Sequence, residues 1–168
     1  GASAGFGQAI CRRLVADGYR VIGSARRIDK LHALQEELGE AFYPLQMDVT
    51  DLSQVDHALA SLPKAWERVD VLVNNAGLAL GLAPAYEAEI ADWLTMIQTN
   101  IVGLTYLTRK ILPQMVERND GYIINLGSTA GTVPYPGANV YGASKAFVKQ
   151  FSLNLRADLA GKKIRVSK

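Results

Sequence analysis

Three residues in the C-terminal third of the chain have the types and spacing for acid–base chemistry. Ser128 follows an apolar run, residues 121–127, and Tyr141 and Lys145 stand four apart where a helical pattern begins. Residues four apart on a helix share a face. Because the ordinary pKa of a phenol is about 10, a neighbouring ammonium group is needed to favour its ionised form near neutral pH. The pattern predicts Tyr141 as the general acid and base, with Lys145 activating it and Ser128 binding the substrate oxygen.

A second pair, Tyr106 and Lys110, repeats this spacing. It lies within a long helical pattern with no serine at a strand end before it, so we interpret it as part of a packed helix. Tyr141 instead follows a loop rich in Gly and Pro, and such loops commonly display functional groups. The Tyr141 pair is therefore the catalytic candidate.

The chain opens on a glycine-rich segment, Gly-Ala-Ser-Ala-Gly-Phe-Gly, that leads into a helical pattern. Glycine lets the backbone turn tightly and approach a ligand closely. The free amides and the positive dipole end of the following helix attract phosphate groups. The segment predicts a pyrophosphate-binding loop, although its spacing differs from the usual G-x-G-x-x-G. Its candidate residues are Gly1, Ser3, Gly5, Phe6 and Gly7.

Two arginines, Arg26 and Arg27, follow the first predicted strand, residues 20–25. In a unit that binds NAD, an acidic residue about 20 positions beyond the loop bonds the ribose hydroxyls. No such residue stands here before Asp29, which belongs to the first turn of the next predicted helix. Guanidinium groups match the charge and geometry of a ribose 2′-phosphate. The pattern favours NADP over NAD, and the alternative is a pair of solvated arginines.

Further candidates stand where predicted strands end, because ligands of doubly wound sheets bind at the carboxyl ends of strands. Asp48 and Val49 close the strand at residues 42–47, which places Asp48 near the adenine. The alternative for Asp48 is helix capping, a role that Asp51 or Ser53 also fits.

The continuous apolar strand at residues 69–73 ends in Asn74, Asn75, Ala76 and Gly77. Continuous apolar runs are typical of buried parallel strands. Small residues directly after such a strand let a flat cofactor lie close to the backbone. Residues 75–77 are therefore further candidates for cofactor binding.

Helical and strand patterns alternate along the whole chain. Helices are expected from the glycine-rich segment to about residue 17 and over 31–38, 53–62, 92–116 and 141–159; strands over 20–25, 42–47, 69–73, 121–127 and 164–168. Asn100 lies inside the long helix, where a polar side chain needs a partner. The order predicts an α/β fold of the Rossmann-like, doubly wound type. It comprises one domain, residues 1–168, with a single parallel sheet and helices on both faces.

Composition limits the class of protein. With 49% hydrophobic residues, 20% charged residues and a net charge of +2, the sequence is typical of a globular domain without a nucleic-acid footprint. No apolar run reaches the roughly 18 residues of a membrane span. The single cysteine, Cys11, is expected in the core, and His32 and His57 lack metal-ligand partners at suitable spacing. Because a disulfide framework is excluded, a reducing compartment and a cytoplasmic protein are expected.

The two ends of the sequence indicate a slice of a longer chain. A phosphate loop normally follows a strand, yet Gly1 already belongs to the loop, and residues 164–168 indicate a strand just begun. We therefore expect a first strand before this segment and further chain after it.

Taken together, these residues resemble the short-chain dehydrogenases/reductases. Residues 1–7 are similar to the family's cofactor loop without its leading threonine, and residues 74–77 match its motif after the fourth strand. Four positions match its catalytic tetrad: Asn100, Ser128, Tyr141 and Lys145. Within the family, the segments at 24–27 and 74–81 are most similar to enzymes that oxidise small 3-hydroxy acids with NADP.

The resemblance implies a role for each catalytic candidate. Tyr141 would exchange the proton, and Lys145 would lower its pKa and bind the nicotinamide ribose. Ser128 would orient the substrate oxygen, and Asn100 would hold a water of a proton relay. Asn75 would contact the cofactor near the nicotinamide.

The resemblance also implies how the cofactor and the subunits are held. Arg26 and Arg27 would bind the 2′-phosphate. Asp48 and Val49 would bind the adenine. Such enzymes are usually homotetramers built on the two long helices, here residues 92–116 and 141–159.

The implied reaction is hydride transfer between NADP(H) and the C3 hydroxyl or carbonyl of serine, L-allo-threonine or 3-hydroxypropionate. One alternative keeps the chemistry and changes the substrate to a 3-oxoacyl thioester, a polyol or another small carbonyl. Another is a non-catalytic NADP-binding regulator. A regulator would be expected to lack Ser128, Tyr141 or Lys145, and all three are present.

Overall fold

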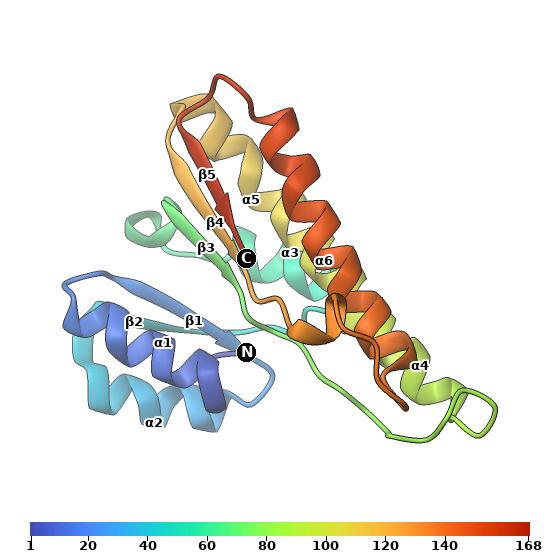
Figure 1. The fold of residues 1–168 in the computed structure, drawn as a ribbon. Helices are drawn as coiled ribbons and strands as arrows, with labels where there is room; N and C mark the ends of the chain where they lie inside the picture. The colour runs from blue at the N-terminus through green and yellow to red at the C-terminus, as the bar shows by residue number, and fades with distance from the viewer. The chain divides into compact units, whose positions relative to one another are not determined.

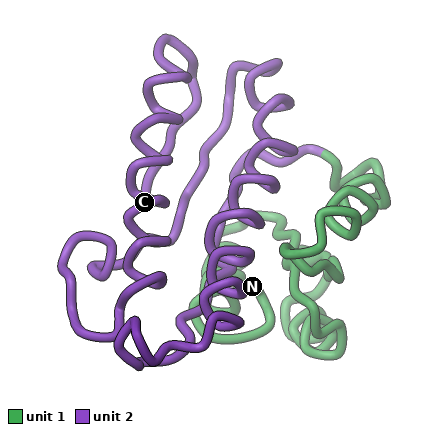
Figure 2. Tube along the Cα trace, turned by 90° about the vertical axis from the view of Figure 1, so that its right-hand side faces the viewer, with its two compact units in different colours: residues 1–67 green, residues 68–168 purple.

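A computed structural model describes all residues, 1–168, and every strand pairing in it is parallel (Figure 1). The chain divides into two compact units, residues 1–67 and residues 68–168 (Figure 2). None of its helices combines the length and the apolar character that crossing a bilayer requires.

The first unit joins helices to a two-stranded parallel sheet. Its elements are α1 (Gly5–Ala16), β1 (Val21–Ala25), α2 (Ile28–Leu38), η1 (Gly39–Ala41), β2 (Phe42–Gln46), α3 (Leu52–Ala60) and η2 (Lys64–Trp66). The register of the sheet places Val21 opposite Phe42.

The core of this unit forms around the ring of Phe42. Phe42 is 1% exposed and lies in one buried cluster with Leu31 and Leu34 of α2. A Cβ atom on Gly23 of β1 would overlap the Phe42 ring, so the strand needs glycine where the ring crosses it. Cys11 is buried in the same cluster, which confirms its expected place in the core.

The second unit joins three strands to the longest helices. Its elements are β3 (Val71–Asn74), α4 (Ile90–Ile97), η3 (Gln98–Gly103), α5 (Leu104–Arg118), β4 (Gly121–Asn125), η4 (Thr129–Gly131), α6 (Asn139–Asp158) and β5 (Ile164–Ser167). Strand β4 is central and pairs with β3 on one side and with β5 on the other.

Buried polar side chains fasten β3 and β4 to two of these helices. Asn74 Nδ2 donates to Thr108 Oγ1 at 3.0 Å and to Asn125 Oδ1 at 2.8 Å. Asn125 Nδ2 donates in turn to Ser152 Oγ at 2.9 Å. Because Thr108 belongs to α5 and Ser152 to α6, both helices cover the same face of the sheet, as Figure 1 shows.

The parallel α/β architecture confirms the predicted fold class, but the prediction of a single sheet is wrong. The strands form two sheets, of order β1-β2 and β3-β4-β5. The pairing partners explain the difference: β1 pairs only with β2, β3 and β5 pair only with β4, and no strand of residues 1–168 pairs with both groups.

The long helix predicted over residues 92–116 is not one continuous α-helix. It comprises α4 and α5 with a π-helical turn, η3, between them, and Asn100 lies within that turn. Apolar periodicity extends across the junction and gives no sign of it. Since π-helical turns inside α-helices occur frequently at functional sites, this turn marks Asn100 for attention.

Candidate functional site

Ser128 lies directly after β4 and caps the short helix η4. Its Oγ accepts a hydrogen bond from the Ala130 backbone N–H at 3.1 Å. A hydroxyl group has one donor hydrogen and two acceptor lone pairs. Because the bond to Ala130 uses a lone pair, the O–H of Ser128 remains available to donate to a ligand oxygen.

Two glycines let η4 lie directly against the first turns of α6. A Cβ atom on Gly131 would come within 2.6 Å of the Lys145 carbonyl carbon. A Cβ atom on Gly142 would come within 2.9 Å of the Ala130 carbonyl oxygen. Each glycine thus removes a side chain that would separate the two elements. This contact sets Ser128 beside the turn of α6 that carries Tyr141 and Lys145.

Lys145 is buried beneath that turn. It is 8% exposed, and its Nζ donates to the Leu126 carbonyl oxygen at 2.9 Å. Its Nζ lies 6.0 Å from the centre of the Tyr141 ring. Burial lowers the pKa of Lys145 because desolvation destabilises the charged form. Lys110, in the competing pair, is exposed, so only the Tyr141 pair has a buried ammonium group.

Asn100 joins the loop after β3 to α6. Its Oδ1 accepts from the Leu78 N–H at 3.0 Å, and its Nδ2 donates to the Leu78 carbonyl at 2.8 Å and to Ser144 Oγ at 3.1 Å. Ser144 Oγ donates to the Tyr141 carbonyl oxygen at 2.7 Å. Sequence reasoning missed Ser144, whose only signal is its place in the helix turn between Tyr141 and Lys145.

Gly77 links the loop after β3 to the same group of residues. A Cβ atom on Gly77 would lie 3.4 Å from Asn100 Oδ1 and 3.4 Å from Lys145 Nζ. The preceding residue pair, Asn75 and Ala76, is half-buried, and the Asn75 N–H donates to the Val73 carbonyl at 3.0 Å. The second unit therefore brings residues 75–77 together with the four tetrad candidates.

The first unit holds the remaining candidates, beginning with the glycine-rich loop. Helix α1 begins at Gly5, whose φ is +56°, and no side chain caps its first turn. Its first amides therefore lack a side-chain acceptor, as an anion site requires. Gly7 is buried, whereas the Phe6 side chain is 80% exposed.

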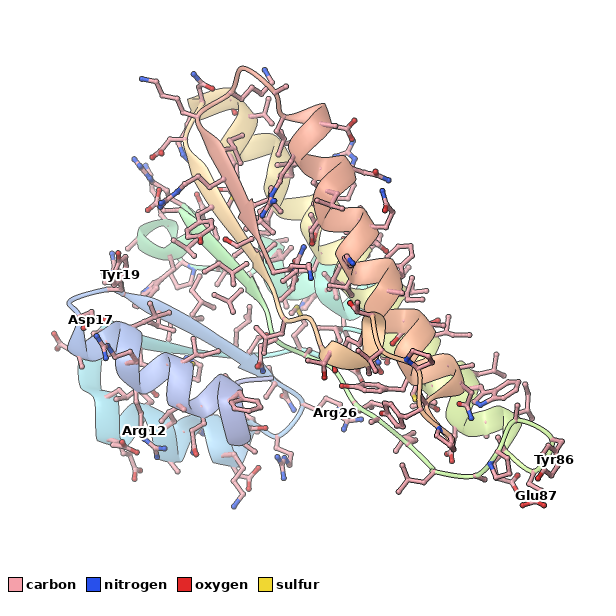
Figure 3. All side chains as sticks on the ribbon, in the orientation of Figure 1. Arg12, Asp17, Tyr19, Arg26, Tyr86 and Glu87 are labelled. Atoms are coloured by element: carbon pink, nitrogen blue, oxygen red, sulfur yellow. The ribbon has the colours of Figure 1, made fainter.

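Both arginines lie near this loop. Arg27 Nη2 donates to Ser3 Oγ at 3.1 Å, which brings the guanidinium group to the glycine-rich segment. Arg26, labelled in Figure 3, follows the carboxyl end of β1 and has an exposed side chain. This unit thus presents two guanidinium groups beside an uncapped helix start, a combination that suits a phosphorylated ribose.

Asp48 and Val49 follow β2 and are half-buried. Asp48 Oδ1 accepts from the Thr50 N–H at 2.9 Å and from Thr50 Oγ1 at 2.8 Å. Helix α3 is capped by Asp51, whose Oδ1 accepts from the Gln54 N–H at 3.0 Å. Capping is therefore the role of Asp51, and the second carboxylate oxygen of Asp48 makes no hydrogen bond within the chain.

The side chains of the site offer hydrogen-bond donors and no set of metal ligands. A lysine ammonium has three donors, and Lys145 directs one of them to a carbonyl, so ribose hydroxyls would satisfy the other two. The chain holds no group of three or more His, Cys, Asp or Glu side chains placed to bind a metal, and His32 and His57 are exposed. The donor set fits a dinucleotide.

Comparison with known proteins gives consistent matches over the whole chain. The family profile described as short chain dehydrogenase matches residues 1–168. A probable NADP-dependent dehydrogenase of Haemophilus influenzae is 60% identical over 167 residues, which are 99% of this chain and 66% of that protein. An NADP-dependent 3-hydroxy acid dehydrogenase, YdfG, of Salmonella typhi is 59% identical over 99% of this chain and 67% of its own length.

A solved structure gives the same match in three dimensions. The closed form of serine dehydrogenase complexed with NADP⁺ superposes with a TM-score of 0.97 at 57% identity, covering 99% of this chain and 67% of that chain. The chain thus spans about two thirds of the length of the curated relatives it matches.

The close contact between η4 and α6 predicts that Gly131→Ala disturbs the site. The added Cβ would push η4, and Ser128 with it, away from α6. Because a displacement of about 1 Å can cost about 100-fold in rate, we expect kcat to fall by about 10- to 100-fold in the full-length protein. Steady-state kinetics measure this.

Thr132→Ala is the matched control, since it trims an exposed side chain from the residue after Gly131. Its kcat is expected to stay within about twofold of that of the parent protein. If Gly131→Ala has a kcat as high as that of this control, the contact does not position Ser128.

Proposed function

Because the chain belongs to the short-chain dehydrogenase family, we propose that it is the cofactor-binding and catalytic part of an NADP-dependent oxidoreductase acting on small 3-hydroxy acids. The observation that carries the proposal is the buried Lys145 ammonium group beside the Tyr141 ring, with Asn100 and Ser128 held around the same turn of α6. The family match confirms the resemblance that the motifs predicted.

In the proposed reaction, proton transfer is the task of Tyr141. The phenolate of Tyr141 takes the proton from the C3 hydroxyl of the substrate, and the positive charge of Lys145 stabilises that phenolate. The free O–H of Ser128 donates to the same substrate oxygen and polarises it as the carbonyl forms. NADP, when bound, takes up the hydride that leaves C3. In the reductive direction Tyr141 returns the proton.

Asn100 acts mainly by positioning its neighbours. Its side-chain amide can make four hydrogen bonds, and Leu78 and Ser144 supply three. One lone pair on Oδ1 and the backbone of the π-helical turn remain to hold a water of a proton relay. Its main effect is to fix the Gly77 loop against α6.

We assign the proposed cofactor contacts by the chemistry of each segment. The amides of the glycine-rich loop bind the pyrophosphate: Gly1, Ser3, Gly5, Phe6 and Gly7. Arg26 and Arg27 bind the 2′-phosphate, supported by the bond that ties Arg27 to Ser3. Asp48, through its unused carboxylate oxygen, and Val49 bind the adenine. Residues 75–77 and Lys145 bind the nicotinamide end.

The choice of 3-hydroxy acids rests on the relatives. One relative is described as an NADP-dependent 3-hydroxy acid dehydrogenase and another, in Agrobacterium fabrum, as a serine 3-dehydrogenase that is 51% identical. These identities, between 51% and 60%, each extend over 167 residues, or 99% of this chain. Serine, L-allo-threonine and 3-hydroxypropionate are the proposed substrates, in a cytoplasmic setting.

We also propose a homotetramer built on the helices at 92–116 and 141–159. An apolar stripe on α4 supports it, because Ile90, Leu94 and Ile97 share one face and are 63%, 59% and 37% exposed. On α6, Leu153 is 43% exposed. Exposed apolar residues that cluster on a helix face commonly mark subunit contacts.

Leu94→Glu tests this assembly. A charge in the middle of the stripe would be buried without a partner on association, so we expect the tetramer to dissociate to smaller species at micromolar concentration. Light scattering coupled to gel filtration measures the mass. Tyr19→Glu, at a 52% exposed position of the first unit, is the control and should leave the mass unchanged. A Leu94→Glu protein with the mass of the parent contradicts the assignment.

Initial rates in the full-length protein test the proposed function. Serine, L-allo-threonine and 3-hydroxypropionate are offered with NADP and, in parallel, with NAD. We expect turnover with NADP and at least about tenfold lower kcat/KM with NAD. Arg27→Ala should raise the KM for NADP by about 10-fold or more and leave that for NAD unchanged, because the 2′-phosphate is the one group of the cofactor that the guanidinium is proposed to contact.

The other outcomes separate the alternatives. Turnover with NAD alone contradicts the role of the arginines. Turnover only with 3-oxoacyl thioesters or polyols supports the proposed hydride transfer and contradicts the proposed 3-hydroxy acid substrates. NADPH binding without turnover of any alcohol or carbonyl supports a regulator.

A further inference from the structure

Asn139 forms a hydrogen-bonded junction at the start of α6, two residues before Tyr141. Its Oδ1 accepts from the Trp93 indole N–H at 3.1 Å and from the Val140 backbone N–H at 2.8 Å. Its Nδ2 donates to the Ala83 carbonyl oxygen at 3.1 Å. One amide side chain therefore joins the first turn of α6 to α4 and to the loop that follows β3.

The backbone at this junction is also unusual. Asn139 has a φ of +22°, and only one other non-glycine residue of the chain, Asn119, has a positive φ. Residues other than glycine rarely adopt a positive φ, and such conformations persist where surrounding contacts hold them. No side chain of the N-cap residue, Ala138, bonds the first turn of α6, so the bond from Val140 to Asn139 takes that place.

A second contact holds the same segment independently. Gly137 has a φ of +82°, and a Cβ atom on it would overlap the backbone of Leu82. The chain entering α6 thus lies directly on the backbone of residues 82 and 83. Trp93 and Asn139 form part of the wall of a recess there, together with Leu80 and Gly81.

We propose that Asn139 is a positioning residue for Tyr141, an inference that rests on the proposed function. It contacts no reacting atom. Its three bonds set where α6 begins and how its first turn is rotated, and the Tyr141 side chain leaves from that turn. Asn100 fixes the same turn through Ser144 at its other end. The phenol is thereby oriented from both sides.

Asn139→Ala removes all three bonds and should misdirect the phenol. We expect kcat to fall by about 10- to 100-fold, with the KM for NADP changed less than about threefold. Asn139→Asp keeps the oxygen that accepts from Trp93 and Val140 and loses the donor to Ala83, so its kcat should lie between those of Asn139→Ala and the parent protein.

Trp93→Phe removes only the indole donor to Asn139. Its effect on kcat is expected to be smaller than that of Asn139→Ala. The double variant Trp93→Phe/Asn139→Ala should be no slower than Asn139→Ala alone, because both substitutions break the same junction. Additive losses would show that Trp93 acts by another route and would contradict the junction.

Asn119→Ala is the matched control. Asn119 also has a positive φ, of +52°, and its Oδ1 accepts from the Lys163 N–H at 3.0 Å, but it ends α5. Its replacement should lower the melting temperature about as much as Asn139→Ala does while leaving kcat within about twofold. If the control loses as much activity, the effect of Asn139 is one of general stability.

A spectroscopic measurement separates this inference from the proposed function. In full-length protein labelled with 3-fluorotyrosine, the ¹⁹F resonance of Tyr141 is assigned by its loss in Tyr141→Phe. Asn139→Ala should shift or broaden that resonance, and Asn119→Ala should not. An unchanged resonance with unchanged kcat refutes the positioning role. A shifted resonance in a protein that oxidises no hydroxy acid upholds the positioning role and rejects the proposed substrate.

Discussion

A buried ammonium group is the constraint on which the rest of the site depends. Lys145 is 8% exposed, and desolvation lowers its pKa below the usual 10.5. Since the unfolded chain then holds this proton more tightly, the group costs stability at low pH, and the cost is relieved as pH rises through the folded pKa towards 10.5. Such a cost is typical of functional sites. The Leu126 carbonyl offsets part of it and fixes Nζ beside the Tyr141 ring.

The elements around Lys145 come close to its ammonium group and its backbone through hydrogen bonds and glycines. Asn125 directly precedes Leu126, and its bonds to Asn74 and Ser152 tie the ends of β3 and β4 to α6. Gly131 lets η4 touch the backbone of Lys145, and Gly77 leaves room above Nζ. Hydrogen bonds from side-chain amides, and glycines at points of close approach, thus determine the geometry of the site more than apolar packing does.

Sequence reasoning predicted most elements but not the contacts between them. Apolar periodicity and the positions of glycines predicted the bounds of α6 and β4 to within about two residues. Ser128, Tyr141 and Lys145 were predicted from residue type and spacing, whereas Asn100 joined them through the family resemblance. Pairing into two sheets, the π-helical turn at Asn100, and the bonds of Ser144 and Asn139 were missed, because they depend on residues distant in the chain. Asn139 carries no local signal, since its positive φ exists only where Trp93 and Ala83 meet its side chain.

In the proposed reaction the Tyr141 oxygen transfers the proton, and the rest of the site does not depend on that oxygen. Tyr141→Phe removes only that oxygen. In the full-length protein, kcat with the best hydroxy acid is measured together with the dissociation constant of NADPH from fluorescence. We expect kcat to fall by about 100-fold or more while the dissociation constant changes less than about threefold. A variant that keeps kcat within about threefold of the parent protein would contradict it.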